Sequence, residues 1–433
     1  MSEVKLEDIV SLCKRRGFIF QGSEVYGGLA GTWDYGPLGI ELKKNIMNLW
    51  WKMFVEDRDD MYGVDAAILM NQKVWQASGH VDTFTDPLVE CSNCKGRFRA
   101  DKLDDPNKCP ACGKTSTFGE ARAFNMMFKT NVGPVADDNS ISYLRPETAQ
   151  GIFTNFKNIV DTFYPDIPFG VGQQGKAFRN EISPRDFVFR SREFEQMEIE
   201  YFIHESQWEK QFNHWKDQWH AYFEALGLPK ESVHELEVPE ADRAHYSKRT
   251  VDFEFDYPIG KEELAGLAYR TDFDLGNIQR VSGKSMEYRP KDGSAPFVPH
   301  VIEPTIGVER AVMAVLTSAY REDEQNGEKR IYLAFPEHIA PVKYAVLPLV
   351  KNKPELVAKA REVYTALKKK YGNVMWVDTG NIGKNYRKMD EIGVPYCVTV
   401  DFDTLEDNTV TIRDRDTTEQ KRVAVDDIQT THS

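Results

Sequence analysis

The sequence contains no run of about 18 apolar residues, the length that a helix needs to cross a bilayer. Its first eight residues, MSEVKLED, have neither the basic stretch nor the apolar stretch of a secretion signal. We therefore expect a cytoplasmic protein without a membrane partner. Positive charge is also scarce, because 55 Lys and Arg stand against 68 Asp and Glu, a net charge of −13. This balance argues against a surface that is basic overall, as polyanion binding requires.

The acidic excess is confined to one part of the chain. Residues 341–433 carry 15 Lys and Arg and 14 Asp and Glu, whereas residues 1–340 carry 40 and 54. A near-neutral C-terminal region can still present a local basic face, so a nucleic-acid partner remains possible there. Hydrophobic residues make up 41% of the chain, which is typical of a folded protein and not of a disordered one.

Cysteine is scarce as well, with six residues in 433, and four of them form two Cys-x-x-Cys pairs. Pairs of this kind in a reducing compartment favour a metal site over disulfides. Fourteen residues separate the pairs, which suits a zinc ribbon with four thiolate ligands; a ribbon-like fold that holds no metal is the alternative. Four thiolates leave no open position, so the zinc would be structural. The predicted ligands are Cys91, Cys94, Cys109 and Cys112, while Cys13 and Cys397 are expected to be core thiols.

The chain is longer than one hydrophobic core usually serves, so we expect more than one domain. A charged stretch at residues 321–329 contains Gly327 and predicts a loop or connector, with a boundary near Pro336. Beyond it, apolar runs at residues 344–350, 374–377 and 396–400 alternate with helical patterns at 354–370 and 382–392, which indicates a compact α/β domain. The predicted ranges are 1–90 and 113–335 for the two parts of a catalytic domain, 91–112 for an inserted ribbon, and 336–433 for the C-terminal domain.

Several elements of the larger part can be predicted from spacing. Leu42, Ile46, Leu49 and Met53 follow Gly36 and Pro37 at helical intervals, and residues 64–70 have the composition of a strand. Residues 168–203 alternate around a turn at 183–186, which indicates two antiparallel strands. A capping-box pattern at residues 206–209 begins a helix whose aromatic stripe belongs in the core. That stripe consists of Trp208, Phe212, Trp215 and Trp219.

Two segments concentrate the groups that a nucleoside triphosphate requires. Residues 178–181 (FRNE) and 190–194 (RSREF) place cations and an aromatic ring on the predicted hairpin, although such hairpins are often only solvated faces. At residues 303–310 (EPTIGVER), Gly307 stands where a strand meets a helix, and Arg310 lies near the N-terminus of that helix, where phosphate binds favourably. Taken alone, Gly307 could equally be a packing device.

In this order, the segments resemble the three motifs of class II aminoacyl-tRNA synthetases. The helix after Gly36 and Pro37 resembles motif 1, residues 178–198 resemble motif 2 and residues 307–310 resemble motif 3. Further strings are similar to the dimeric glycyl-tRNA synthetase family, and the similarity covers nearly the whole chain. These strings are WDYGPLG at 33–39, LRPETAQG at 144–151, RNEISPR at 179–185 and VIEP at 301–304.

The resemblance implies an α/β protein with an α+β catalytic domain, whose mainly antiparallel sheet is flanked by helices, followed by an anticodon-binding domain. It implies glycine, ATP with Mg²⁺ and tRNA(Gly) as partners, and a homodimer through motif 1. Neither reaction step demands a protein nucleophile, because the glycine carboxylate is already ionised. The chain departs from the family at Thr305, where Ser is common, and its motif 1 region lacks the well-placed proline of other class II enzymes.

The resemblance also assigns residues to the site. Arg179, Glu181 and Arg310 are the predicted catalytic residues, with Arg179 on the α-phosphate and Arg310 on the γ-phosphate, and Phe194 is expected to stack on adenine. The predicted ATP-binding set is Arg179, Asn180, Glu181, Phe189, Arg190, Ser191, Arg192, Glu193, Phe194, Glu263, Leu264, Gly307, Val308, Glu309 and Arg310. The predicted glycine-binding set is Arg99, Glu147, Phe194, Glu195, Gln196, Met197, Glu198, Arg270, Glu303, Pro304, Thr305, Ile306 and Gly307.

Two rival hypotheses can be distinguished by residues. Another class II synthetase with the same C-terminal domain is disfavoured by three glutamates at the amino-acid site, Glu147, Glu198 and Glu303. A catalytically dead, synthetase-like binding protein, such as the accessory subunit of a mitochondrial DNA polymerase, is expected to lose the ATP-binding arginines, whereas Arg179, Arg190 and Arg310 are all present.

Overall fold

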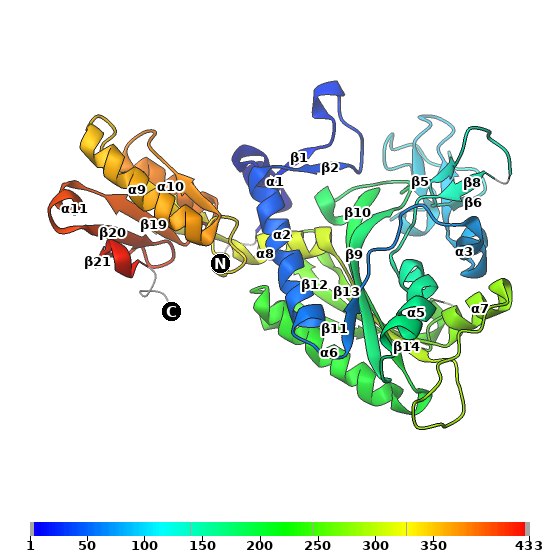
Figure 1. Ribbon diagram of the computed structural model, residues 1–433. Helices are drawn as coiled ribbons and strands as arrows, with labels where there is room; N and C mark the ends of the chain where they lie inside the picture. The colour runs from blue at the N-terminus through cyan, green and yellow to red at the C-terminus, as the bar shows by residue number, and fades with distance from the viewer. Residues whose placement is uncertain (1–3, 139, 245, 326, 429–433) are drawn as a thin grey trace.

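A computed structural model describes residues 4–428 except 139, 245 and 326. Residues 1–3 and 429–433, at the ends of the predicted ranges 1–90 and 336–433, lie outside the described residues. The chain forms two lobes (Figure 1): a large lobe around a long sheet, and a C-terminal lobe, orange to red, at the left of the view. Among the described residues, no helix is both long and apolar enough to cross a membrane.

The large lobe is built on a seven-stranded sheet in the order β11-β12-β13-β14-β10-β9-β3. All pairs are antiparallel except β3 with β9, as the predicted mainly antiparallel sheet requires. The predicted hairpin of residues 168–203 is confirmed as β9 and β10, joined by a loop and a 3₁₀ turn, Phe187–Phe189. The strands are β3 (Met61–Gly63), β9 (Phe169–Phe178), β10 (Glu193–Ile203), β11 (Val233–Glu237), β12 (Arg249–Tyr257), β13 (Gly260–Thr271) and β14 (His300–Gly307).

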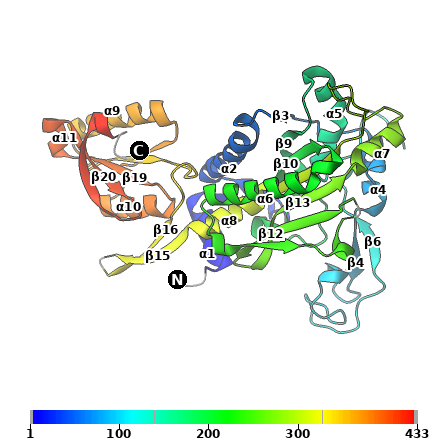
Figure 2. The same cartoon turned by 90° about the horizontal axis from the view of Figure 1, so that it is seen from below.

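Helices α6 (Trp208–Ala225) and α8 (Val308–Ala319) lie across one face of this sheet (Figure 2). The aromatic stripe of α6 packs into the core as predicted: Phe212, Trp215 and Trp219 are each at most 1% exposed, and Trp208 is half-buried against the same core. The predicted helix after Pro37 is confirmed as α2 (Pro37–Trp51), which packs on α8 and continues as a π-helical turn, Lys52–Glu56. The predicted capping box does not form, because Gln207 is the N-cap of α6 and the amide of Ser206 donates to His204.

On the opposite face, helices α5 (Ala149–Phe163) and α7 (Phe273–Ser282) cover only one end of the sheet. Phe153 and Phe156 of α5 pack against Phe169 and Phe202, and these side chains form a second hydrophobic core. The other end of this face is left for polar side chains of β10, β13 and β14, and the candidate functional site lies there.

Two further predictions about secondary structure are wrong. Residues 64–70 are not a strand; the edge strand is β3, three residues earlier, because Met61 to Gly63 pair with β9 before the chain leaves the sheet. The segment at 321–329, predicted to be a loop or connector, does connect the lobes, but it is not a loop: it belongs to a hairpin of β15 (Tyr320–Gln325) and β16 (Glu328–Leu333). Its charges drew the loop prediction, yet they pair with one another, as Arg330 does with Asp323 at 2.8 Å.

The C-terminal lobe confirms the predicted alternation of strands and helices. Its five-stranded sheet has the order β18-β17-β19-β20-β21, with two parallel pairs around β17. Helix α9 packs on β17, β18 and β19. The elements are β17 (Tyr344–Pro348), α9 (Pro354–Tyr371), β18 (Val374–Trp376), α10 (Ile382–Glu391), β19 (Tyr396–Val400), α11 (Phe402–Asp407), β20 (Thr409–Asp414) and β21 (Gln420–Ala424).

A buried ionic cluster joins the two lobes. Asp390 of α10 is fully buried and accepts two hydrogen bonds from Arg413 of β20, at 2.7 and 3.0 Å. Arg330 of the β15–β16 hairpin, 1% exposed, reaches the same carboxylate at 3.3 Å. At the edge of this junction, Arg16 at the end of α1 (Leu6–Arg16) donates to Glu391 at 2.5 Å. The hairpin therefore connects the lobes through buried charge as well as through the chain.

Candidate active site

The open end of the sheet face forms a cavity of about 330 Å³. Strand alternation explains its lining, because Phe194, Gln196 and Glu198 of β10 are two residues apart and point to the same side. Eighteen of the predicted site residues line it. They are Arg99, Glu147, Arg179, Glu181, Phe189, Arg190, Ser191, Phe194, Gln196, Glu198, Glu263, Leu264, Glu303, Thr305, Ile306, Gly307, Glu309 and Arg310.

The remaining predicted site residues lie outside this lining. Alternation along β10 turns Glu195 and Met197 to the other face, where Glu195 pairs with Lys43 of α2 and Met197 enters the core. The amide of Asn180 donates to Met126, and Arg192 donates to the carbonyls of Ala30 and Glu181. Glu193 pairs with Lys176 at 2.8 Å. Pro304 is buried within β14, Val308 is buried at the start of α8, and Arg270 lies behind Glu303.

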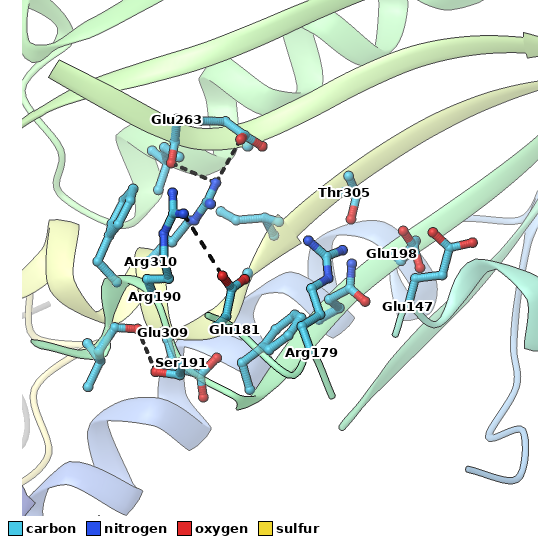
Figure 3. Close-up of a pocket in the computed structure, with 18 of the residues that line it drawn as sticks. Glu147, Arg179, Glu181, Arg190, Ser191, Glu198, Glu263, Thr305, Glu309 and Arg310 are labelled. Atoms are coloured by element: carbon cyan, nitrogen blue, oxygen red, sulfur yellow. Dashed lines mark hydrogen bonds and ion pairs between the residues drawn. The ribbon is translucent and has the colours of Figure 1, made fainter. Parts of the chain in front are cut away.

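Arginines gather at one end of the cavity (Figure 3). Arg310, in the first turn of α8, lies 2.9 Å from the carboxylate of Glu263 and packs over the ring of Phe189 at 4.7 Å. The positive charge of Arg310 holds the pKa of Glu263 below its usual range. Arg190 lies 3.9 Å from Glu181. This end offers guanidinium groups beside an open helix N-terminus, a combination that binds phosphates.

Arg179 stands between the two ends of the cavity (Figure 3). Its Nε donates to the carbonyl of Pro146 at 3.1 Å, and its guanidinium packs between the rings of Phe84 and Phe194, at 5.4 and 5.3 Å. These contacts fix the side chain before any ligand arrives. A guanidinium held in this way can stabilise negative charge that develops at the middle of the cavity.

Carboxylates gather at the opposite end. His80 lies 3.4 Å from Glu147. Burial alone would raise the pKa of Glu147, but the interactions with His80, Arg270 and Arg179 together lower that pKa to about 2. Glu198 accepts from the hydroxyl of Thr148, and Arg270 donates to Glu303 at 2.6 Å. Burial, together with the charge of Glu147, raises the pKa of Glu198. A small cation such as an ammonium group would be stabilised here.

Gly307 is the junction between strand β14 and helix α8. Its backbone is extended, and a Cβ placed on it would meet only the side chain of Arg310, at 3.8 Å or more. The glycine is therefore not required by core packing. It leaves space beside the N-terminus of α8, on the cavity side, for a ligand to approach the backbone.

The four paired cysteines form a cluster outside the main sheet, next to a small sheet of β4 (Thr85–Glu90), β5 (Arg97–Arg99) and β6 (Arg122–Asn125). Their four sulfur atoms lie within 4.8 Å of one another. The pair Cys91 and Cys112 is 3.8 Å apart, and Cys94 and Cys109 are 3.6 Å apart. A tetrahedron of Zn–S bonds of about 2.3 Å has edges of about 3.8 Å, so the donors fit zinc.

The small sheet also reaches the cavity. Arg99, at the end of β5, lines it and pairs with Asp86 of β4 at 2.9 Å. The connection between β9 and β10 also contacts this small sheet, because the hydroxyl of Ser183 donates to the carbonyl of Arg97 in β5 at 3.3 Å. The small sheet next to the cysteine cluster thus holds Arg99 at the cavity.

Sequence reasoning missed several contributors to the site. Tyr246 lines the cavity, and Arg270 packs over its ring at 3.8 Å; His80 orients Glu147, and Asp274 holds Arg270 at 2.7 Å. Tyr246, His80 and Asp274 all lie outside the motif strings, so the sequence around them carried no signal. Gln150 was within reach, because it belongs to the LRPETAQG string and donates to Asp274 at 2.9 Å.

Each of the two lobes matches a known protein family. Residues 128–319 match the family "tRNA synthetase class II core domain (G, H, P, S and T)", and residues 343–431 match "Anticodon binding domain". The glycine–tRNA ligases of Clostridium acetobutylicum and Streptomyces coelicolor are 48% and 46% identical to the chain, and each alignment covers 99% of the chain and 98% of the relative. The glycine–tRNA ligase of Borrelia garinii is 47% identical, over 98% of the chain and 96% of the relative.

A solved structure has the same fold at low sequence identity. The prolyl-tRNA synthetase of Cryptosporidium parvum, complexed with halofuginone and AMPPNP, superposes with a TM-score of 0.67 at 15% identity, covering 98% of the chain and 73% of that protein. The likeness extends over both lobes and concerns their fold.

Proposed function

The chain belongs to the class II aminoacyl-tRNA synthetases and, among them, to the glycine–tRNA ligase family, and we propose that its cavity activates glycine with ATP. The single observation that carries the proposal is the separation of charge within one cavity, with Arg190 and Arg310 at one end and Glu147 and Glu198 at the other. A triphosphate suits the first end and the ammonium of an amino acid suits the second. The carboxylate of that amino acid then points toward the α-phosphate between them.

Activation proceeds by attack of a glycine carboxylate oxygen on the α-phosphorus of ATP, which releases pyrophosphate and leaves glycyl-adenylate. In our assignment Arg179 neutralises the α-phosphate, Arg310 binds the γ-phosphate and Phe194 stacks on adenine. ATP enters as its Mg²⁺ complex, and the ion offsets further phosphate charge. The protein contributes alignment and charge stabilisation, and supplies no nucleophile.

Transfer follows when a ribose hydroxyl at the 3′ end of tRNA(Gly) attacks the carbonyl carbon of the adenylate, forming the ester and releasing AMP. We assign residues 336–433 to recognition of the anticodon, since residues 343–431 match an anticodon-binding family. We also propose that α2, as motif 1, forms a homodimer interface, and that the reaction takes place in the cytoplasm.

Selection of glycine is a matter of size. Every other proteinogenic amino acid places at least a methyl group at Cα, and we propose that Glu147, Glu198, Glu303 and Thr305 fill the space into which that group would project. Steric exclusion of this kind rejects a larger side chain more strongly than the roughly 1–3 kcal/mol that an extra methylene contributes by binding. Editing of misactivated amino acids is then unnecessary.

The proposed function is tested by amino-acid-dependent ATP–pyrophosphate exchange at saturating ATP and Mg²⁺, with glycine, alanine, serine, proline, threonine and histidine. We expect exchange with glycine alone. Exchange with a different amino acid would overturn the assignment of the glutamate pocket and retain the synthetase fold. No exchange with any of them would favour a binding protein that has lost catalysis.

We further propose a structural zinc ion on Cys91, Cys94, Cys109 and Cys112. Protein purified without chelators is expected to contain about one zinc per chain by elemental analysis, because the four sulfur atoms are spaced as in a tetrahedral site. Cys109→Ser should lose most of this zinc, whereas Cys13→Ser, a buried cysteine in helix α1, should retain it. Wild-type protein without zinc would contradict the proposal.

A further inference from the structure

A fourth glutamate lies beneath the carboxylate end of the cavity. Strands β10 and β14 pair Glu198 with Thr305 and Tyr201 with Ile302, so the same register places Glu200 opposite Glu303. Glu200 also shares a face of β10 with Glu198, two residues before it. One carboxylate oxygen from each of Glu198, Glu200 and Glu303 lies within 4.8 Å of the others.

Glu200 differs from its neighbours in what it contacts. Its side chain is fully buried, and neither carboxylate oxygen has a hydrogen-bond partner among the described residues. Glu303, in contrast, accepts from Arg270 at 2.6 Å, and Glu198 accepts from Thr148. An ionised carboxylate buried without a partner is strongly unfavourable, and like charges opposite each other across two strands destabilise a sheet.

The charges around Glu200 are mostly negative. Glu198 on its own strand, Glu303 on β14 and Asp274 on α7 face it, and Arg270 on β13 is the compensating cation. Arg270 is already engaged by Asp274 and Glu303. Burial, reinforced by the charge of Glu303, raises the pKa of Glu200 well above its usual range. Burial raises the pKa of Glu303 as well, but Glu303 accepts a hydrogen bond from Arg270, whereas Glu200 has no donor. The proton that relieves this cluster therefore belongs on Glu200.

We propose that Glu200 is a neutral carboxylic acid whose hydroxyl donates a hydrogen bond to the Glu303 carboxylate, and that it thereby positions Glu303 for the ammonium group of glycine. Arg270 on one side and Glu200 on the other then hold Glu303 in one orientation. Glu200 is a positioning residue that acts through Glu303 and does not touch the substrate. The positioning role of Glu200 depends on the proposed function, whereas the presence of a proton between Glu200 and Glu303 does not.

The test compares two replacements at residue 200 that differ in one property. Glu200→Gln retains an N–H donor of similar size, and Glu200→Leu removes the donor. In glycine-dependent pyrophosphate exchange, we expect Glu200→Leu to raise KM for glycine about tenfold or more, since a hydrogen bond to a charged group is lost, and to change KM for ATP by less than about twofold. Glu200→Gln should keep KM for glycine within about threefold of the wild type.

The pH profile gives a readout that a purely structural role would not change. In the wild type, kcat/KM for glycine should fall at high pH as Glu200 loses its proton and repels Glu303. In Glu200→Gln this step should be absent, since the amide has no proton to lose in that range. Titration of the free amino group of glycine is common to both proteins and cancels in the comparison. The exposed Glu205, just beyond the end of β10, provides the control variant Glu205→Gln.

Infrared spectroscopy tests the proton without any assay of activity. The carbonyl stretch of a protonated carboxyl group should be present in the wild type and in Glu205→Gln, and one such band should be missing from Glu200→Gln. This measurement remains decisive if Glu200→Leu fails to fold. It also remains decisive if the wild type shows no exchange with glycine, which would contradict the proposed function alone.

Three results would overturn the proposal. An unchanged KM for glycine in Glu200→Leu would show that Glu303 needs no partner at this position. Equal losses in Glu200→Gln and Glu200→Leu would mean that Glu200 acts as an anion, as a direct ligand of a cation would. A spectrum of Glu200→Gln that retains every protonated-carboxyl band of the wild type would place the proton elsewhere.

Discussion

Replacing Arg179 with alanine is expected to lower kcat/KM for glycine-dependent pyrophosphate exchange by about 10²- to 10³-fold, the loss typical of removing one preorganised group that stabilises the transition state. Arg179 lies in the middle of the cavity, where we propose that the α-phosphate binds and gains charge as the carboxylate attacks. Its contacts with Pro146 and with the rings of Phe84 and Phe194 hold it there in advance. Alanine removes the charge and leaves those partners in place, so the fold should survive.

Arg185→Ala is the matched control for this experiment. Arg185 belongs to the same β9–β10 connection, but its side chain is 58% exposed and pairs with the neighbouring Asp186. Exchange should be close to wild type in this variant, and the melting temperatures of both variants should be similar. Near-normal exchange in Arg179→Ala would mean that the assignment of motif 2 is wrong.

Replacing Asp390 with asparagine is expected to destabilise the protein by about 3–5 kcal/mol, the cost of removing one partner from a buried ion pair. The variant leaves the guanidinium of Arg413 buried without a counter-charge and removes a contact of Arg330. Because Arg330 belongs to the β15–β16 hairpin, the loss affects the junction of the lobes as well as the C-terminal lobe. Urea unfolding with calorimetry as a second probe measures the change.

Asp403→Asn provides the comparison, because this aspartate also lies near an arginine but at the surface. It is 3.8 Å from Arg422 with a side chain 75% exposed, and exposed pairs contribute little. Its unfolding curve should nearly coincide with that of the wild type. If Asp390→Asn also left the curve unchanged, the buried cluster would contribute no net stability to the junction.

Elements whose signal is local could be predicted from the sequence. Pro37 marks the start of α2, and the aromatic spacing of α6 identifies its buried face without reference to the rest of the chain. The same holds for the two strands of motif 2, because a hairpin is a local pairing. The charged ends of the cavity followed from the family resemblance, which assigns Arg179, Arg310 and Glu147 directly.

Features that depend on distant partners were missed or misplaced. The charges of β15 and β16 look solvated in sequence, and only Asp390, 60 residues beyond Arg330, explains why one of them is buried. The site prediction also took residues 194–198 as a continuous block, although a strand shows alternate residues to each face, which sends Glu195 to Lys43. Strand geometry was the information that the block assignment omitted.

The order of the strands also has a consequence for the time course of synthesis. Strand β14 is the last of the seven to be translated, yet it lies between β13 and β10 and pairs with both. Until it leaves the ribosome, β11–β13 and β10–β9–β3 are two half-sheets with unpaired edges facing each other. Such edges are prone to aggregation during folding. A nascent chain stalled before residue 300 should therefore be a client for chaperones, and one released just beyond residue 307 much less so.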